Sequence, residues 1–94
     1  MIILTNRFKK ELGKILDFIK KDSKTRALKF RDDLLSKIDQ IPNYPQIYRK
    51  SLTADDENVK DFIFKGFVVV FRIKNDDIYI LGIYKHNLWK NWQF

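Results

Sequence analysis

Residues 59–89, VKDFIFKGFVVVFRIKNDDIYILGIYKHNLW, decide the fold of this chain. Lys65-Gly66 separates the first two apolar runs, and Asn75-Asp76-Asp77 separates the second run from the third. Short runs rich in β-branched and aromatic residues, bounded by Gly, Asn and Asp, are typical of antiparallel strands joined by tight turns. The stretch therefore predicts a three-stranded meander, with strands over residues 59–64, 67–74 and 78–84.

Period-two alternation assigns the side chains of this meander to faces, because successive residues of a strand point to opposite sides of a sheet. In the first strand Lys60, Phe62 and Phe64 fall on one side. In the second strand both sides are apolar: Phe67, Val69, Phe71 and Ile73 form one side, and Val68 and Val70 form the other. This pattern predicts a central strand that is buried on both faces.

The residues before the meander have helical periodicity. Over residues 7–21 the apolar positions recur at i, i+4, i+7, i+8 and i+11, which predicts an amphipathic helix capped by Thr5 or Asn6. A second helix is predicted over residues 25–41, with Ser23 as its cap and Pro42 and Pro45 after its end. The connection between the helices is short, which favours an antiparallel hairpin.

Two further strands complete the expected fold. Residues 2–4 form a short apolar run that is predicted to join the sheet beside the meander, and residues 47–51 are predicted to form another strand. The expected order is β-α-α-β-β-β-β within one domain, residues 1–94. This is an α+β fold with an N-terminal strand, a two-helix antiparallel hairpin and a mostly antiparallel C-terminal sheet, in which the helices cover one apolar face.

Composition narrows the classes of function. The chain has no cysteine and one histidine, so we expect no metal site and no cofactor. The formal net charge is +7, and residues 1–41 carry most of it, with 11 Lys and Arg against 6 Asp and Glu. A positive field of this kind attracts nucleic acid, ribosomes or an acidic protein. No apolar run approaches the roughly 20 residues of a membrane span, and no signal-peptide core is visible. We therefore expect a soluble cytoplasmic protein without a membrane partner.

The second half of the chain contains an ordered set of short motifs: Gly66-Phe67, Val70-Phe71-Arg72, the turn at Asp76-Asp77, the run 78–83 and the basic pair Lys85-His86. This set, with the predicted order of elements, the length and the charge, resembles the RelE/ParE superfamily of toxins from bacterial type II toxin–antitoxin systems. The resemblance implies a toxin that a cognate antitoxin neutralises in a hetero-oligomer. RelE-like members cut messenger RNA on the ribosome, whereas ParE-like members resemble proteins that poison DNA gyrase.

The cations that RelE-like members use are only partly present. Metal-independent RNA cleavage needs a general base, cations that hold the phosphate and a general acid. The resemblance gives Lys60 the place of a catalytic lysine, but Phe62 and Val68 stand where a second lysine and an arginine are typical. His86 replaces a second arginine, and no tyrosine follows it. A ribonuclease would therefore rely on Lys60, Arg72 and His86.

Binding surfaces are expected at two places. Arg49, Lys50 and Lys85 are candidate contacts to a target or a phosphate, in one patch with Lys60 and Arg72 or as scattered solvated charges. Leu88, Trp89 and Trp92 either pack back onto the domain or form an apolar strip that an antitoxin covers. An acidic antitoxin segment would complement the two basic helices.

Three hypotheses follow for the function. The first is a ParE-like toxin that binds DNA gyrase and is neutralised by an antitoxin. The second is a ribosome-dependent mRNA endoribonuclease of the RelE kind. The third is a binding domain of the same fold that is not toxic.

Overall fold

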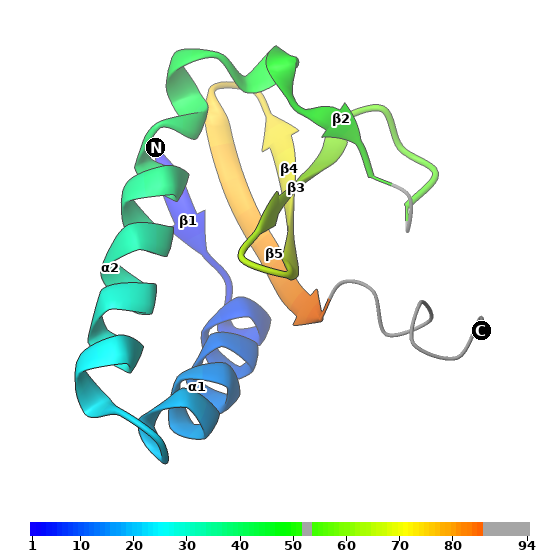
Figure 1. Ribbon diagram of the computed structural model, residues 1–94. Coiled ribbons are helices and arrows are strands. Elements are labelled where there is room, and N and C mark those ends of the chain that lie inside the picture. The colour runs from blue at the N-terminus through cyan, green and yellow to red at the C-terminus, as the bar shows by residue number, and fades with distance from the viewer. Residues whose placement is uncertain (52–53, 86–94) are drawn as a thin grey trace.

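The computed structural model of the chain describes residues 1–51 and 54–85. Two helices lie on one side of a five-stranded sheet (Figure 1). The elements in chain order are β1 (Ile2–Leu4), α1 (Asn6–Lys20), α2 (Lys24–Asp39), two 3₁₀ turns η1 (Ile41–Asn43) and η2 (Pro45–Ile47), β2 (Arg49–Lys50), β3 (Val59–Phe64), β4 (Phe67–Lys74) and β5 (Asp77–Lys85). The predicted α+β fold and its β-α-α-β-β-β-β order are confirmed.

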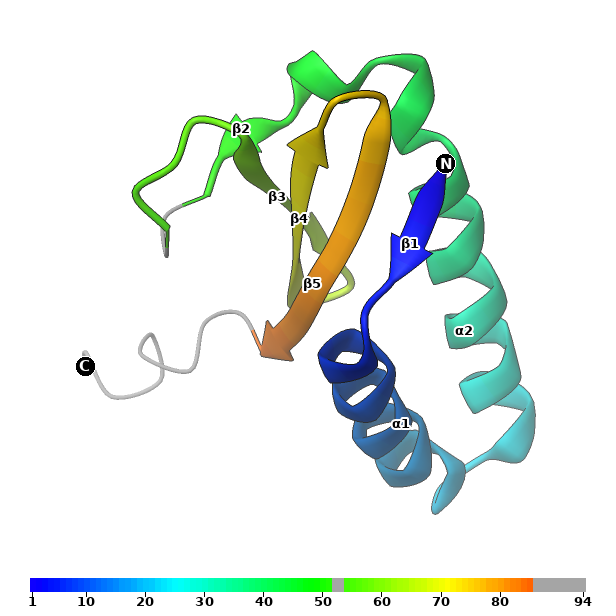
Figure 2. The ribbon, with the colours of Figure 1, turned by 180° about the vertical axis from the view of Figure 1, so that it is seen from behind.

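The strand order in the sheet is β1-β5-β4-β3-β2. The first strand of the chain lies beside the last one, and β1 runs parallel to β5 (Figure 2). The other three pairs are antiparallel. The meander of β3, β4 and β5 therefore forms the middle of the sheet, as predicted, with β1 and β2 as short edge strands.

The first meander turn uses a left-handed backbone. Lys65 and Gly66 both have positive φ, at 49° and 85°. Two successive residues with positive φ are typical of a type I′ turn, whose twist matches that of the flanking strands. In the second turn Asn75 has a φ of 57°, which asparagine tolerates better than most residues.

Side-chain hydroxyls cap both helices. The oxygen of Thr5 accepts a hydrogen bond from the backbone N–H of Phe8 at 3.2 Å. The oxygen of Ser23 accepts one from the N–H of Arg26 at 3.1 Å. Each bond satisfies an amide that the first helical turn leaves unpaired, so both predicted cap positions are confirmed.

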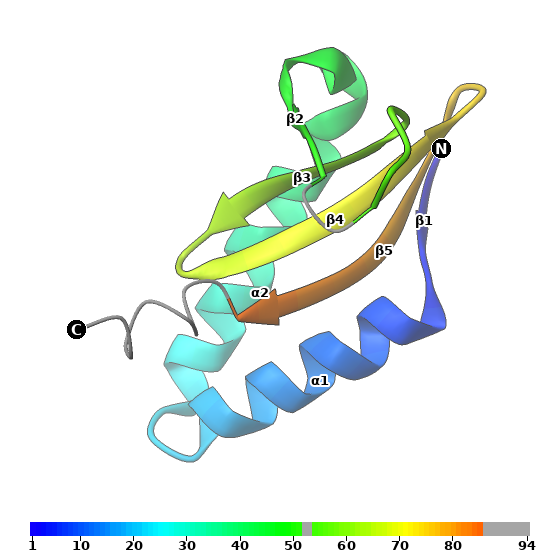
Figure 3. The same ribbon diagram turned by 90° about the vertical axis from the view of Figure 1, so that its right-hand side faces the viewer.

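The main core lies between the helices and one face of the sheet, which we call the helix face. In Figure 3, α2 lies behind the sheet and α1 runs along the edge formed by β5. The most deeply buried core residues include Phe8, Leu34, Ile41, Val69, Phe71 and Ile80. A second, smaller cluster of Val59, Val68 and Val70, with Ala54 and Leu81 against it, lies on the opposite face, which we call the open face. The central strand is thus apolar on both sides, as the alternation predicts.

The segment between the helices and the meander differs from the prediction. The second helix ends at Asp39, and Ile41 begins a 3₁₀ turn instead of closing the helix. The expected strand over 47–51 shrinks to Arg49–Lys50 because Pro45 opens a second 3₁₀ turn that runs to Ile47. Proline fixes φ and lacks an amide hydrogen, which suits the first position of such turns. Among the described residues, no helix is long and apolar enough to cross a membrane.

Candidate functional site

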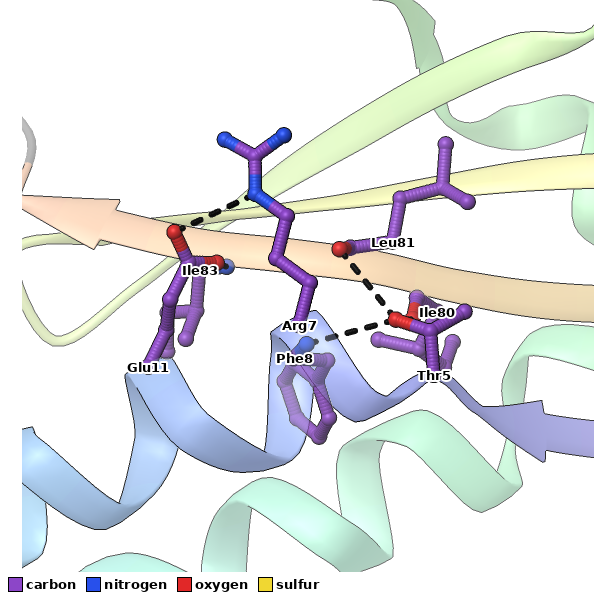
Figure 4. A network of polar contacts seen from close by, with 7 residues as sticks. All are labelled: Thr5, Arg7, Phe8, Glu11, Ile80, Leu81 and Ile83. Atoms are coloured by element: carbon purple, nitrogen blue, oxygen red, sulfur yellow. Dashed lines mark hydrogen bonds and ion pairs between the residues drawn. The ribbon is translucent and has the colours of Figure 1, made fainter.

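A network of polar side chains binds backbone groups on the outer edge of β5, beyond the point where β1 ends (Figure 4). β1 ends at Leu4, which is in register with Ile80. Next along the chain, the backbone N–H of Thr5 donates to the Ile80 carbonyl at 3.2 Å, and the Thr5 hydroxyl donates to the same oxygen at 2.7 Å. One threonine therefore caps α1 and ends the β1–β5 ladder.

Glu11 continues this network along β5. Its Oε1 accepts a hydrogen bond from the backbone N–H of Ile83 at 3.0 Å, and its Oε2 lies 3.4 Å from Arg7 Nε. A side chain on Gly82 would place its Cβ 2.7 Å from Glu11 Oε1. The glycine therefore allows the carboxylate to reach the strand, just past the register shift that β5 makes opposite Val70.

The open face carries a cavity of about 430 Å³ beside this network. Its lining includes Val59, Val70 and Leu81 of the open-face cluster, together with Tyr84. Arg7 and Glu11 line it from the side of α1. The cavity therefore combines an apolar lining from the sheet with one ion pair from α1.

A second depression of about 560 Å³ lies between α1, α2 and the β3–β4 turn, and we call it the helix groove. Its apolar lining consists of Ile15, Phe18, Ile19, Phe30 and Phe67, and its charged lining consists of Lys14, Arg26, Lys65 and Lys85. All four charged lining residues are cations. Phe18 is 69% exposed, which is unusual for so large an apolar side chain. The groove therefore presents apolar rings inside a positively charged border.

Two lysines of the helix groove lie over aromatic rings. Lys85 Nζ is 5.3 Å from the centre of the Phe67 ring, and Lys65 Nζ is 5.3 Å from that of Phe64. Lys65 also donates a hydrogen bond to Asp33 Oδ2 at 3.1 Å. This bond, together with one from Lys29, lowers the pKa of the Asp33 carboxyl below its usual value of 3.8. Two of the four cations of the groove, Lys65 and Lys85, therefore contact aromatic rings, and Lys65 also contacts one carboxylate.

The predicted basic residues of the sheet do not share one surface. Arg49 is in register with Asp61 and forms an ion pair with it on the open face. The Asp61 side chain is buried, and its second oxygen has no hydrogen-bond partner in the described part of the chain. Arg72 lies on the same face, opposite Val59, with its Nη2 3.9 Å from Asp56 Oδ2.

Lys50, Lys60 and Lys85 lie elsewhere. Lys50 is opposite Lys60, and Lys60 is opposite Phe71, whose side chain belongs to the core of the helix face. Lys85 is at the far end of β5, in register with Phe67. The five cations are therefore divided among the open face, the β2–β3 edge of the helix face and the helix groove.

The other predicted site residues, His86, Leu88, Trp89 and Trp92, lie outside the described residues. Within residues 1–51 and 54–85, no group of three or more His, Cys, Asp and Glu side chains is placed to hold a metal ion.

Reasoning from sequence missed the helix groove. The one signal for it is Phe18, which falls outside the apolar stripe of the first helix and so predicts an exposed ring. The contribution of the β3–β4 turn to the groove depends on how the helices cross the sheet, which periodicity does not determine.

Comparisons with known proteins identify one family and one similar fold. Residues 2–87 match the family described as ParE toxin of type II toxin-antitoxin system, parDE. No match was found among curated proteins. A solved structure of the chromosomal ParDE toxin–antitoxin system from P. aeruginosa superimposes with a TM-score of 0.73. The match covers 90% of this chain and 94% of that one at 19% sequence identity, so it supports the fold.

Proposed function

Because this chain belongs to the ParE toxin family of type II toxin–antitoxin systems, we propose that it arrests growth by binding DNA gyrase in the cytoplasm. We further propose that a cognate antitoxin neutralises it by forming a complex with it. Family membership supports the toxin role and the antitoxin partner, and the arrangement of the basic side chains supports binding over catalysis.

The proposal of binding over catalysis rests on the placement of Lys60 and Arg72. Lys60 lies on the helix face in register with Phe71, whereas Arg72 lies on the open face in register with Val59. Two cations on opposite faces of one sheet cannot hold the same phosphate, yet metal-independent RNA cleavage needs converging groups. A ribonuclease that uses both side chains is therefore disfavoured, and a toxin that acts through binding is favoured.

A supercoiling assay tests the gyrase target. Purified chain, made by cell-free synthesis, is added to gyrase, ATP and relaxed plasmid. We expect loss of supercoiling or accumulation of cleaved DNA at the concentrations that arrest growth. Gyrase that stays fully active at those concentrations refutes the target.

Variants then locate the target surface. Arg49→Ala, Lys50→Ala and Lys85→Ala are expected to weaken inhibition of gyrase. Lys10→Ala, at an exposed position of α1, is the matched control for the loss of one positive charge. Equal inhibition by all four variants would remove these residues from the target contact.

A translation extract with a defined message tests the alternative of RNA cleavage. The gyrase proposal expects intact message. Cuts at codon-defined positions that disappear in Lys60→Ala and His86→Ala would establish the ribonuclease instead. Expression without growth arrest, in cells without the antitoxin, would indicate the non-toxic binding domain.

The helix groove is the surface that we propose for the antitoxin. An acidic amphipathic segment would place apolar side chains on Phe18 and Phe67 and its carboxylates beside Lys65 and Lys85. Phe18→Asp is expected to weaken the complex strongly, because it puts a negative charge among apolar groups. Leu28→Asp is the control, since Leu28 is also exposed on a helix but does not line this groove.

A further inference from the structure

We propose that the end of the helix hairpin binds the phosphate backbone of duplex DNA. This segment, residues 20–26, connects α1 to α2, and we call it the hairpin tip. The inference goes beyond the proposed function, because it concerns the chain and DNA in the absence of gyrase. It rests on the charge of the tip, on a depression that two of its lysines line and on the kinds of side chain that the tip exposes.

The hairpin tip carries positive charge that its surroundings do not compensate. Its sequence, KKDSKTR, has four cations and one acidic residue, Asp22, which is a formal balance of +3. Each cation is exposed and forms no ion pair with another described residue. The four are Lys20, Lys21, Lys24 and Arg26. By contrast, Arg7, Lys29 and Arg31 of the same two helices each lie within 3.4 Å of a carboxylate oxygen.

A shallow depression between the two helices brings two of these lysines together. It measures about 190 Å³ and is lined by Lys20, the last residue of α1, and by Lys24, the first residue of α2. Arg31 lines it too, but its Nε and Nη2 both donate to Asp32. In the lining that the structure describes, Asp17 is the one acidic residue. Lysines from two helices can therefore hold one phosphate group there.

The hairpin tip is accessible to a large partner. Figures 1 and 2 show it at the end of the helix layer, at the opposite end of the molecule from the turn between β4 and β5. Six of its seven residues are exposed, so a polyanion can reach it without a rearrangement of the fold. The depression shares no lining residue with the helix groove. A segment bound in that groove therefore need not occupy Lys20 or Lys24.

The side chains of the tip favour a phosphate backbone over a protein surface. The exposed residues of the tip are lysine, arginine, threonine and one aspartate, and none is apolar. Protein interfaces have an apolar centre and are poor in lysine, whereas phosphate contacts are made by Lys, Arg and Thr side chains and read no base. Phe18, the exposed ring nearest in the sequence, lines the helix groove, so the tip has no aromatic platform for unpaired bases. We therefore commit to duplex DNA, bound without sequence preference.

This contact has a consequence for the proposed target. Gyrase acts on DNA, so a chain that the tip holds on DNA meets gyrase at a raised local concentration. The predicted target contacts Arg49, Lys50 and Lys85 do not belong to the tip and stay available for gyrase.

Fluorescence anisotropy with a short labelled duplex tests the proposal on the unaltered full chain, without gyrase or antitoxin. Four phosphate contacts give a slope of log affinity against log salt of about −3.6, so the affinity should fall roughly 150-fold between about 50 and 200 mM salt. Single-stranded DNA and polyglutamate of equal total charge should compete less well than unlabelled duplex. A chain that does not bind the duplex at the lower salt concentration, or for which either competitor equals the duplex, would overturn the proposal.

Paired variants separate the tip from the net charge of the chain. Replacing Lys20 and Lys24 together by alanine should halve the salt slope to about −1.8, because two of four contacts are lost. The control replaces Lys10 and Lys74 by alanine, which removes the same charge from exposed positions of α1 and β4, and it should keep the slope. Equal changes in the two double variants would assign the binding to net charge and overturn the proposal.

Asp17→Asn supplies a test in which affinity should rise, which loss of structure cannot imitate. It removes the acidic residue from the lining of the depression and should tighten duplex binding about threefold, the size of the effect of one nearby unit charge in water. Asp39→Asn, at the far end of α2, makes the same change of charge and should leave the affinity unaltered. Equal gains in both variants would contradict the assignment. Gyrase inhibition is measured separately, so a failure of this inference leaves the proposed function standing.

Discussion

Replacement of Thr5 by valine tests whether one hydroxyl joins the first helix to the last strand. Valine keeps the shape and the β-branch of threonine but removes the hydroxyl. The hydroxyl accepts a hydrogen bond from the N–H of Phe8 at 3.2 Å, and it shares its one proton between the carbonyl oxygens of Ile80 at 2.7 Å and Leu81 at 3.3 Å. All of these contacts are lost in the valine variant. The backbone bond from Thr5 to the Ile80 carbonyl, at 3.2 Å, remains.

The size of the effect follows from these contacts. Loss of an N-terminal cap costs about 1 kcal/mol, and a side-chain hydrogen bond contributes about 1 kcal/mol net. The Ile80 carbonyl keeps its backbone donor, so no cost for an unpaired group is expected at that carbonyl. Thr5→Val should therefore lower the free energy of unfolding by about 2 kcal/mol. For a domain of this size, that corresponds to a fall in melting temperature of roughly 8–16 °C.

Urea denaturation followed by far-ultraviolet circular dichroism measures this change. The midpoint should fall while the m-value stays constant, because the surface exposed on unfolding is unaltered. Thr5→Ser keeps the hydroxyl and serves as the control, with an expected loss under about 1 kcal/mol. A Thr5→Val protein within about 0.5 kcal/mol of the unaltered chain, or a Thr5→Ser protein as unstable as Thr5→Val, would refute the reasoning.

Three further predictions concern the same scaffold. Glu11→Ala should destabilise the fold by about 2 kcal/mol in urea denaturation, because it removes the charged acceptor of the Ile83 amide. Glu11→Gln keeps a side-chain oxygen and should lose less stability. Equal losses in the two variants would exclude a stabilising role for this hydrogen bond. Gly13→Ala should stabilise by about 0.5–1 kcal/mol, since a Cβ there meets no atom within 4 Å, whereas Gly66→Ala should destabilise by at least about 1 kcal/mol because its φ is +85°. The folded-state pKa of Asp33 lies below its usual value of 3.8 through Lys65 and then Lys29, so its contribution to stability is present above pH 3.8 and is lost as pH falls through the folded pKa. Unfolding measured from pH 7 to pH 2 should show the stability of Asp33→Asn approaching that of the unaltered chain at the acid end, and a gap that widens there would contradict the assignment.

Much of the fold could be predicted from the sequence because its signals are local. The stripe through Phe8 and Leu12, the caps at Thr5 and Ser23, and the turn at Lys65-Gly66 each depend on residues within a few positions of one another. Such signals predict element types and faces well. The strand predicted over 47–51 is shorter in the structure because Pro45 opens a 3₁₀ turn that runs to Ile47.

The candidate sites could not be predicted to the same degree, because they depend on how distant segments meet. The hydrogen bond that Glu11 accepts from Ile83 joins residues 72 positions apart, at an edge of β5 that lies beyond the end of β1 at Leu4. Arg49 and Lys50 lie on opposite faces because they are successive residues of one strand. Which of them lies on the open face depends on the register between β2 and β3. The register in turn is set by the hydrophobic pattern and by the turn geometry of the assembled sheet.

The core also explains why the division of Lys60 and Arg72 between the two faces is a stable property of this fold. Shifting the register of β3 by one residue would move Lys60 to the open face beside Arg72. The same shift would move Phe62 and Phe64 from the helix face into solvent, and Phe62 is 7% exposed in the native register. Exposing two phenylalanine side chains costs about 3–6 kcal/mol, a large part of the roughly 5–15 kcal/mol that stabilises a domain. The packing that holds the helices on the sheet therefore also keeps these two cations apart, which is the observation on which the proposed binding role rests.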